Sequence, residues 1–288
     1  MKTLSTSALH RIRLIPACRC VAVALALLFQ PVPCQSALVG QWTFENGSLA
    51  DSTGNFGNLE LKGNASIING ALDVNGSGNT PTGWARTPGT FSAGGGGGVA
   101  IGSKTLVSWV TLESLSATAS AGSVMTLDGV TGDRFDGIVF AEQQTNRWMN
   151  GSNGWNRSPS GQFTGSGAVE SSTGNLIQMA ITYQDIGGGN VEIKGYRDGV
   201  LMNSYTSANF ASWGANEQEV IFGARRYYID IDNAIGAVNA LIHEARLYDT
   251  ALTQSEIQSL VMVPEPSTAA LLALAASGLG AHIVRRRR

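Results

Sequence analysis

Residues 176–183 read Leu-Ile-Gln-Met-Ala-Ile-Thr-Tyr, and a short polar stretch separates them from a second run, Val191–Tyr196, which ends in the turn Arg197-Asp198-Gly199. Apolar and polar side chains alternate along much of both runs, which is the period-2 pattern of a half-buried strand. Gly, Asn and Asp between such runs are typical turn residues. The segment therefore predicts two antiparallel strands joined by tight turns.

The same pattern recurs on both sides of this segment and decides the fold class. At least ten strands punctuated by turn residues predict an all-β, antiparallel β-sandwich or jelly roll rather than a parallel α/β sheet. One helix is signalled, because Thr253 and Glu256 form a capping box just before Ile257. We place this single domain at residues 37–262. The eight further strand runs are Leu38–Phe44, Leu59–Leu61, Ala71–Val74, Thr105–Leu112, Ser123–Leu127, Gly137–Ala141, Val220–Gly223 and Leu241–Tyr248.

Composition excludes several classes of protein. The 288 residues include 36 glycines without a three-residue period, which excludes collagen, and the 43% hydrophobic share excludes a disordered chain. Eight of the 19 Lys and Arg lie in the two ends of the chain; residues 37–263 hold 11 basic and 20 acidic residues, a net charge of −9. Such an acidic domain has no basic stripe for phosphates, so we expect no nucleic-acid partner.

The first 36 residues have the layout of a secretory signal peptide. Lys2, Arg11 and Arg13 precede the apolar run Val21–Phe29, and small residues follow near position 36. Nine apolar residues are too few to span a bilayer, which needs about 20. Cleavage after Ser36 would remove all three cysteines, so we expect an exported domain without disulfides or thiol chemistry.

The last 26 residues form a separate predicted tail, 263–288. Pro264, Glu265, Pro266 and Ser267 precede an apolar segment at 269–284, and four arginines end the sequence. The apolar segment predicts a short transmembrane helix whose arginines stay cytoplasmic.

This order of motif, helix and arginines resembles the PEP-CTERM sorting signal of certain Gram-negative bacteria. The resemblance implies an exosortase, a membrane-embedded protease, as processing partner, with transient inner-membrane insertion. It also implies delivery to the cell surface or to an exopolysaccharide matrix. A plain tail anchor that is never cut remains the alternative.

Five stretches of the domain between the ends carry a second resemblance: Leu38–Glu45, Ser108–Val110, Ala180–Tyr183, Gly195–Gly199 and Ile242–Tyr248. In this order they resemble the LamG/concanavalin A-like superfamily. The resemblance implies two antiparallel sheets but no single activity, because this fold carries lectins, glycosidases and adhesive modules.

The most suggestive carbohydrate-binding segment is 147–157. Two tryptophans can stack on sugar rings while amides and guanidinium groups reach hydroxyls. Alternatively, Trp148 packs inward and Trp155 covers a sheet edge. The candidate ligand-binding residues are Arg147, Trp148, Asn150, Asn153, Trp155 and Arg157.

We expect no catalytic residues. Asp230 and Asp232 are spaced for one face of a strand, as a glycosidase needs, but a third acid is missing because Ala234 occupies its position. Glu217 and Glu219 have the same spacing and are expected to solvate the start of the strand at Val220.

No cofactor is expected except a structural calcium ion. Ca²⁺ takes six to eight oxygen ligands, which two stretches offer, although both sets are also ordinary turn residues. One candidate set is Asp128, Asp133 and Asp136, and the other is Asp230, Asp232 and Asn233.

The sequence therefore predicts an exported, exosortase-processed surface or matrix protein whose sandwich contacts polysaccharide. A secreted glycoside-active enzyme on the same fold and a ligand-free structural matrix protein are the alternatives.

Overall fold

The structure is a computed structural model that describes residues 36–88, 97–115, 122–130, 134–142, 144–152, 169–227 and 234–263. Residues 1–35 of the predicted signal peptide, Asp133, residues 153–168, Asp230 to Asn233 and the tail from Pro264 onward lie outside them. Within the described residues, no helix has the length and apolar character to cross a bilayer.

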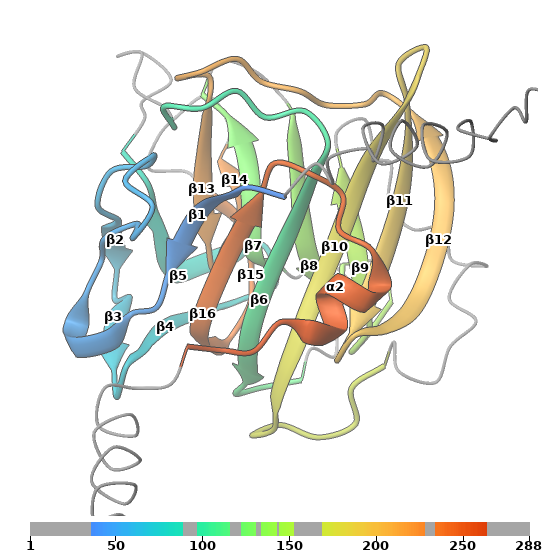
Figure 1. The fold of residues 1–288 in the computed structure, drawn as a ribbon. Coiled ribbons are helices and arrows are strands. Elements are labelled where there is room, and N and C mark those ends of the chain that lie inside the picture. The colour runs from blue at the N-terminus through green and yellow to red at the C-terminus, as the bar shows by residue number, and fades with distance from the viewer. Residues whose placement is uncertain are drawn as a thin grey trace, which may run out of the picture. The chain divides into compact units, whose positions relative to one another are not determined.

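The described elements are sixteen strands, one short α-helix and one 3₁₀ turn (Figure 1). Their bounds are β1 Leu38–Trp42, η1 Glu45–Gly47, β2 Glu60–Gly63, β3 Ser66–Ile68, β4 Ala71–Ser77, β5 Thr80–Arg86, β6 Lys104–Leu112, β7 Ser123–Gly129, β8 Phe135–Phe140, β9 Trp148–Ser152, β10 Leu176–Gly187, β11 Asn190–Arg197, β12 Val200–Ala208, β13 Gln218–Phe222, β14 Ala224–Tyr227, β15 Ala234–Ala237, β16 Ala240–Tyr248 and α2 Gln254–Ser259.

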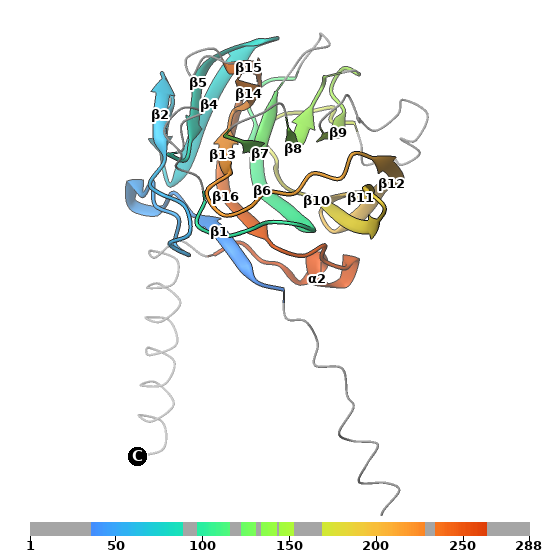
Figure 2. The ribbon, with the colours of Figure 1, turned by 90° about the horizontal axis from the view of Figure 1, so that it is seen from above.

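One continuous antiparallel sheet of 14 strands curls back on itself to make both layers of a β-sandwich. Along the sheet the order is β12-β11-β10-β6-β16-β4-β5-β13-β7-β8-β9. We call the part from β12 to β4, with β1 and β3, sheet A, and the part from β5 to β9, with β2, sheet B. Figure 2 shows the two layers stacked, with α2 on the outer side of sheet A. The predicted all-β sandwich and all ten predicted strands are confirmed.

The corner between the layers lies in β4. Its residues up to Val74 pair with β16, while those from Asn75 onward pair with β5. A register shift between Asn75 and Gly76 marks a bulge, which bends a strand and increases its twist. A Cβ at Gly76 would lie 2.5 Å from the Thr80 carbonyl oxygen, so glycine is required here.

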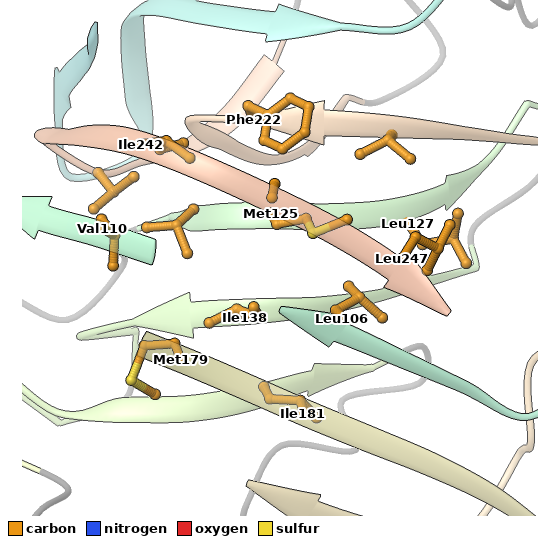
Figure 3. Close-up of a cluster of buried hydrophobic side chains, with 14 of the residues drawn as sticks. Leu106, Val110, Met125, Leu127, Ile138, Met179, Ile181, Phe222, Ile242 and Leu247 are labelled. Atoms are coloured by element: carbon orange, nitrogen blue, oxygen red, sulfur yellow. The ribbon is translucent and has the colours of Figure 1, made fainter. Parts of the chain in front are cut away.

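The main core lies between the layers and follows from the strand alternation. Figure 3 shows these side chains facing one another. Sheet A contributes Leu106, Val110, Met179, Ile181, Ile242 and Leu247, and sheet B contributes Met125, Leu127, Ile138 and Phe222, all at most 1% exposed.

A second apolar cluster covers part of the outer side of sheet A. Trp109, Tyr196 and Tyr248 lie beneath Leu252 and Ile257 of the C-terminal segment. The predicted capping box is present, since the Thr253 hydroxyl accepts from the Glu256 N–H and the Glu256 carboxylate accepts from the Thr253 N–H. This cap fixes where α2 begins over the sheet.

Candidate functional site

The outer side of sheet A carries a pocket of about 350 Å³ beside α2, which we call the outer pocket. Strand alternation points Thr182 and Gln184 of β10 outward, because Ile181 and Tyr183 face the core. Register pairs Thr182 with Lys194 and Gln184 with Glu192, so β11 extends the same polar surface. Tyr196 and Leu201 complete the sheet side of the pocket.

The opposite wall is the segment from Ala251 to Gln254, whose last residue is the first residue of α2. The Gln254 side-chain amide donates to the Gly199 carbonyl oxygen at 3.1 Å, and Gln258 donates to the same oxygen at 3.1 Å. The capping box holds Thr253 in place from the other side. The wall is therefore fixed to the β11–β12 turn before any ligand arrives.

Charge in the outer pocket is concentrated in one ion pair. Glu192 Oε2 lies 2.7 Å from Lys194 Nζ, and both side chains are about one-third exposed. Burial raises the pKa of the Tyr196 phenol, while the nearby Lys194 ammonium acts in the opposite direction. Tyr196 is only 3% exposed, so its ring forms the floor rather than a stacking platform. The accessible groups are amides, hydroxyls and one carboxylate–ammonium pair, which can bind the hydroxyls of a polar ligand.

A different arrangement occupies the outer side of sheet B. Asp128 of β7 and Glu219 of β13 lie directly opposite each other across the strands, 3% and 0% exposed. Burial first, and then the Glu219 carboxylate, raises the pKa of Asp128 well above its ordinary value. The β14–β15 hairpin contacts β5 and β7 over this side of the sheet. The expectation that Glu219 solvates the start of its strand is wrong for this reason, whereas Glu217 is exposed.

The first predicted calcium set does not converge in its described members. Asp136 pairs with Leu127 and Asp128 with Phe135, so the two aspartates point to opposite sides of sheet B. Asp136 faces the core, where its Oδ2 lies 2.8 Å from Lys104 Nζ. Residues 36–263, apart from the gaps given above, contain no group of three His, Cys, Asp or Glu arranged to hold a metal ion. Asp133, Asp230, Asp232 and Asn233 lie outside the described residues, so those assignments stay predictions.

The predicted sugar-binding segment begins as strand β9 rather than as a loop. Trp148 is 0% exposed, its ring centroid lies 4.8 Å from that of Phe140, and its indole N–H donates to Glu170 Oε1 at 2.9 Å. Asn150 is 0% exposed and donates to Asn203 Oδ1 at 3.3 Å. Neither side chain can reach a sugar from these positions, so including them among the binding residues was wrong.

The remaining members of that segment are only partly described. Arg147 is half-buried and pairs through its backbone with Val169. Asn153, Trp155 and Arg157 lie outside the described residues, so their binding role stays a prediction. The sorting-motif residues Pro264, Glu265, Pro266 and Ser267 also lie outside them.

Sequence reasoning did not identify the outer pocket. The predicted strands include Thr182, Glu192, Lys194 and Tyr196 but not Gln184 or Leu201. The alternation Glu192, Lys194, Tyr196 marks one polar side. The missing information was the position of α2, which turns a flat polar surface into a pocket with a second wall.

Two protein-family models match the chain. A family model for the concanavalin A-like lectin/glucanases superfamily matches residues 97–258, more than half of the chain. A second model, for the PEP-CTERM protein-sorting motif, matches residues 263–288. No curated protein matches the chain.

Solved structures agree on the fold. Domain 4 of AbnA, a GH43 extracellular arabinanase from Geobacillus stearothermophilus, in complex with arabinotriose, is similar at TM-score 0.52 and 22% identity; the match covers 77% of this chain and 97% of that one. A mutant Trypanosoma rangeli sialidase displaying trans-sialidase activity is similar at TM-score 0.51 and 20% identity, with 78% of this chain and 32% of that one covered. At such identities the similarity concerns the fold alone.

Proposed function

The chain belongs to the concanavalin A-like lectin/glucanases superfamily and carries a PEP-CTERM protein-sorting motif, and from these two facts we propose that its β-sandwich binds polysaccharide at the bacterial cell surface. The motif implies processing by an exosortase and sorting to the cell surface. What the surface domain does there is the subject of the proposal.

The outer pocket is the observation that carries the proposal. Its volume of about 350 Å³ lies within the range of small-ligand pockets, roughly 300 to 1,000 Å³. Gln184, Gln254 and the Glu192–Lys194 pair supply planar and charged groups that hydrogen-bond hydroxyls. The arabinanase domain in complex with arabinotriose supports the idea that a sugar can be held on this fold.

A neutral polysaccharide is the favoured ligand class. The domain from 37 to 263 carries a net charge of −9, which repels polyanions at low ionic strength. A polymer also suits a shallow pocket, because several repeats along one chain can engage many copies of the protein and raise the overall avidity.

We propose that the domain is not a glycosidase. Glycosidases place two carboxylates about 5 to 9 Å apart on either side of a bound sugar, where both can touch it. Asp128 and Glu219 are opposed across β7 and β13, but they are buried under the hairpin. A panel of glycans incubated with the protein should therefore show binding without release of reducing ends.

Glycan binding by the purified protein tests the proposal. Gln184→Ala should weaken binding about five- to tenfold, the effect of one lost hydrogen bond of roughly 1 kcal/mol. Thr206→Ala is the matched control, because Thr206 is exposed opposite Glu192 on the same side of the sheet but does not line the pocket. Trp155→Ala tests the segment 153–168 in parallel.

Each outcome is decisive for one hypothesis. Loss of binding in Gln184→Ala with unchanged binding in Trp155→Ala supports the outer pocket, and the reverse pattern assigns binding to the segment 153–168. A wild-type protein that binds no glycan in the panel contradicts the proposal and favours the ligand-free structural matrix protein.

A further inference from the structure

The chain does not leave the fold freely after α2. Residues 260–263, which we call the C-terminal strap, are bound to the outer side of sheet A. Gln178 donates to the Leu260 carbonyl oxygen at 3.4 Å, Arg246 Nη2 donates to the Val261 carbonyl oxygen at 2.6 Å, and the Val263 N–H donates to Glu244 Oε2 at 2.6 Å. Polar groups of the sheet thus hold the strap backbone at three positions.

The strap side chains alternate between the sheet and solvent. Leu260 and Met262 pack against the cluster that contains Trp109 and Tyr248. Val261, between them, is 74% exposed. This alternation is that of an extended segment lying flat on the sheet, with one side turned inward and the other outward.

The groups that hold the strap are themselves fixed. Glu244 and Arg246 are two residues apart on β16 and so point to the same side. Glu244 is 1% exposed, and its Oε1 accepts from Arg246 Nε at 2.6 Å and from Gln41 Nε2 at 2.8 Å. The Arg246 guanidinium lies 4.7 Å from the Trp109 ring centroid. One carboxylate oxygen therefore orients the pair, and the other is left for the strap.

The strap ends where the sorting motif begins in the sequence. The matched motif starts at residue 263, so Pro264 directly follows the last anchored backbone N–H with no spacer between. A protease generally binds its substrate as an extended strand through backbone hydrogen bonds. The strap residues cannot make those bonds while sheet A holds their own backbone groups.

We propose that Glu244 and Arg246 latch the strap to the domain and thereby confine the sorting protease to the chain beyond Val263. The proposal rests on the exosortase processing that the motif implies and is independent of carbohydrate binding. Cleavage breaks one peptide C–N bond, whose carbonyl carbon gains the oxygen of a water molecule and whose nitrogen gains a proton. The latch decides which bonds are open to this reaction and takes no part in it.

Two latch variants and one control test the proposal in the full-length protein. Met262→Ser removes apolar packing of the strap and changes no residue of β16. Glu244→Gln removes the charge that holds Arg246 and the strap together. Val261→Ser is the control, since that side chain is exposed and its backbone contact remains. Met262→Ser keeps the test valid if Glu244→Gln fails to fold.

The first measurement is the C-terminal residue of the processed protein, by intact mass from a host with its exosortase. Wild type and Val261→Ser should give one C-terminus at or beyond residue 264, whereas the latch variants should add C-termini within 260–263. Wild-type ends at or upstream of Val263, or identical ends in all four proteins, overturn the proposal.

The second measurement is limited proteolysis of the purified full-length protein with a nonspecific protease. Cutting within 260–263 should be about tenfold faster in Met262→Ser than in wild type, because the free energy of local opening governs such cleavage. Equal cutting rates contradict the latch. A wild type that is never processed in the host refutes the exosortase assignment instead, and the proteolysis still decides the latch.

Discussion

The outer sides of the two sheets differ in what covers them. On sheet B, the β14–β15 hairpin contacts β5 and β7, and Trp84, Ile221 and Ala224 form a small apolar cluster there. On sheet A, α2 covers part of the surface (Figure 2). The outer pocket lies beside it. Strand alternation sends polar side chains outward from both sheets.

The cover decides what those polar side chains can do. Asp128 and Glu219 on sheet B are nearly inaccessible, and the Glu219 carboxylate helps to raise the pKa of Asp128. Glu192 and Lys194 on sheet A form an ion pair that water and ligands can reach. We therefore expect polar substitutions to change stability on the covered side and binding on the open side.

The largest effect is expected from Arg225→Ala on the covered side. Arg225 of β14 forms an ion pair with Glu142, and both side chains are less than one-tenth exposed. Removing one partner of a buried pair leaves the other charge uncompensated, which costs about 3 to 5 kcal/mol. Chemical denaturation measures this loss.

Lys194→Ala is the matched change on the open side. It breaks a partly exposed pair, so the free energy of unfolding should fall by less than about 1 kcal/mol. Similar losses in both variants would show that the hairpin does not exclude water from Arg225, and the contrast between the two sides would fail.

The next effect appears only as the pH changes. The folded-state pKa of Asp128 is raised, so its contribution to stability is fully present below the unfolded pKa of about 3.9 and is lost as the pH rises through the folded-state value. Asp128→Asn should therefore gain stability relative to wild type as the pH increases. Thermal unfolding across the acidic and neutral range measures the difference.

Glu219→Gln provides a check on the cause of this pH dependence. It removes the carboxylate that opposes Asp128 and should shift the stability profile in the same direction. A gap between Asp128→Asn and wild type that narrows as the pH rises would mean that the carboxyl pair is not the source.

A further small effect is expected from Thr253→Ala at the border of the open side. Loss of an N-cap hydroxyl costs about 1 kcal/mol, because the Glu256 N–H loses its acceptor. Since Thr253 lines the outer pocket, binding should weaken as well. Ser255→Ala, an exposed change at the second residue of α2, should alter neither urea denaturation nor glycan binding.

The longest strands that the sequence predicted show clear apolar alternation. β10, β11 and β16 each pair with a strand on both sides, and burial of one side imposes the pattern. β5 was missed because Pro81 and Gly83 disfavour a strand, and β12 because it is an edge strand with polar residues at many positions. Edge position also hid β9, which pairs only with β8 through its described residues.

The candidate sites were less predictable because they depend on register and cover. Asp128 and Glu219 are far apart in sequence, and only the pairing of β7 with β13 brings them together. The inward direction of Trp148 depends on its register with Phe140. The capping box, by contrast, is local and was predicted to the residue.

Sheet A cannot be completed before its first strand, β1, pairs with its last strand, β16. Leu38 of β1 pairs with Tyr248 of β16, so this pairing closes a loop of about 200 residues. Contacts between residues so far apart in the sequence form slowly. β16 also joins β6 to β4, so sheet A lacks its centre until the last strand arrives. The strap and the sorting motif follow that strand after only a short connection and α2. A chain that emerges from its N-terminus can therefore complete sheet A only shortly before the sorting motif emerges.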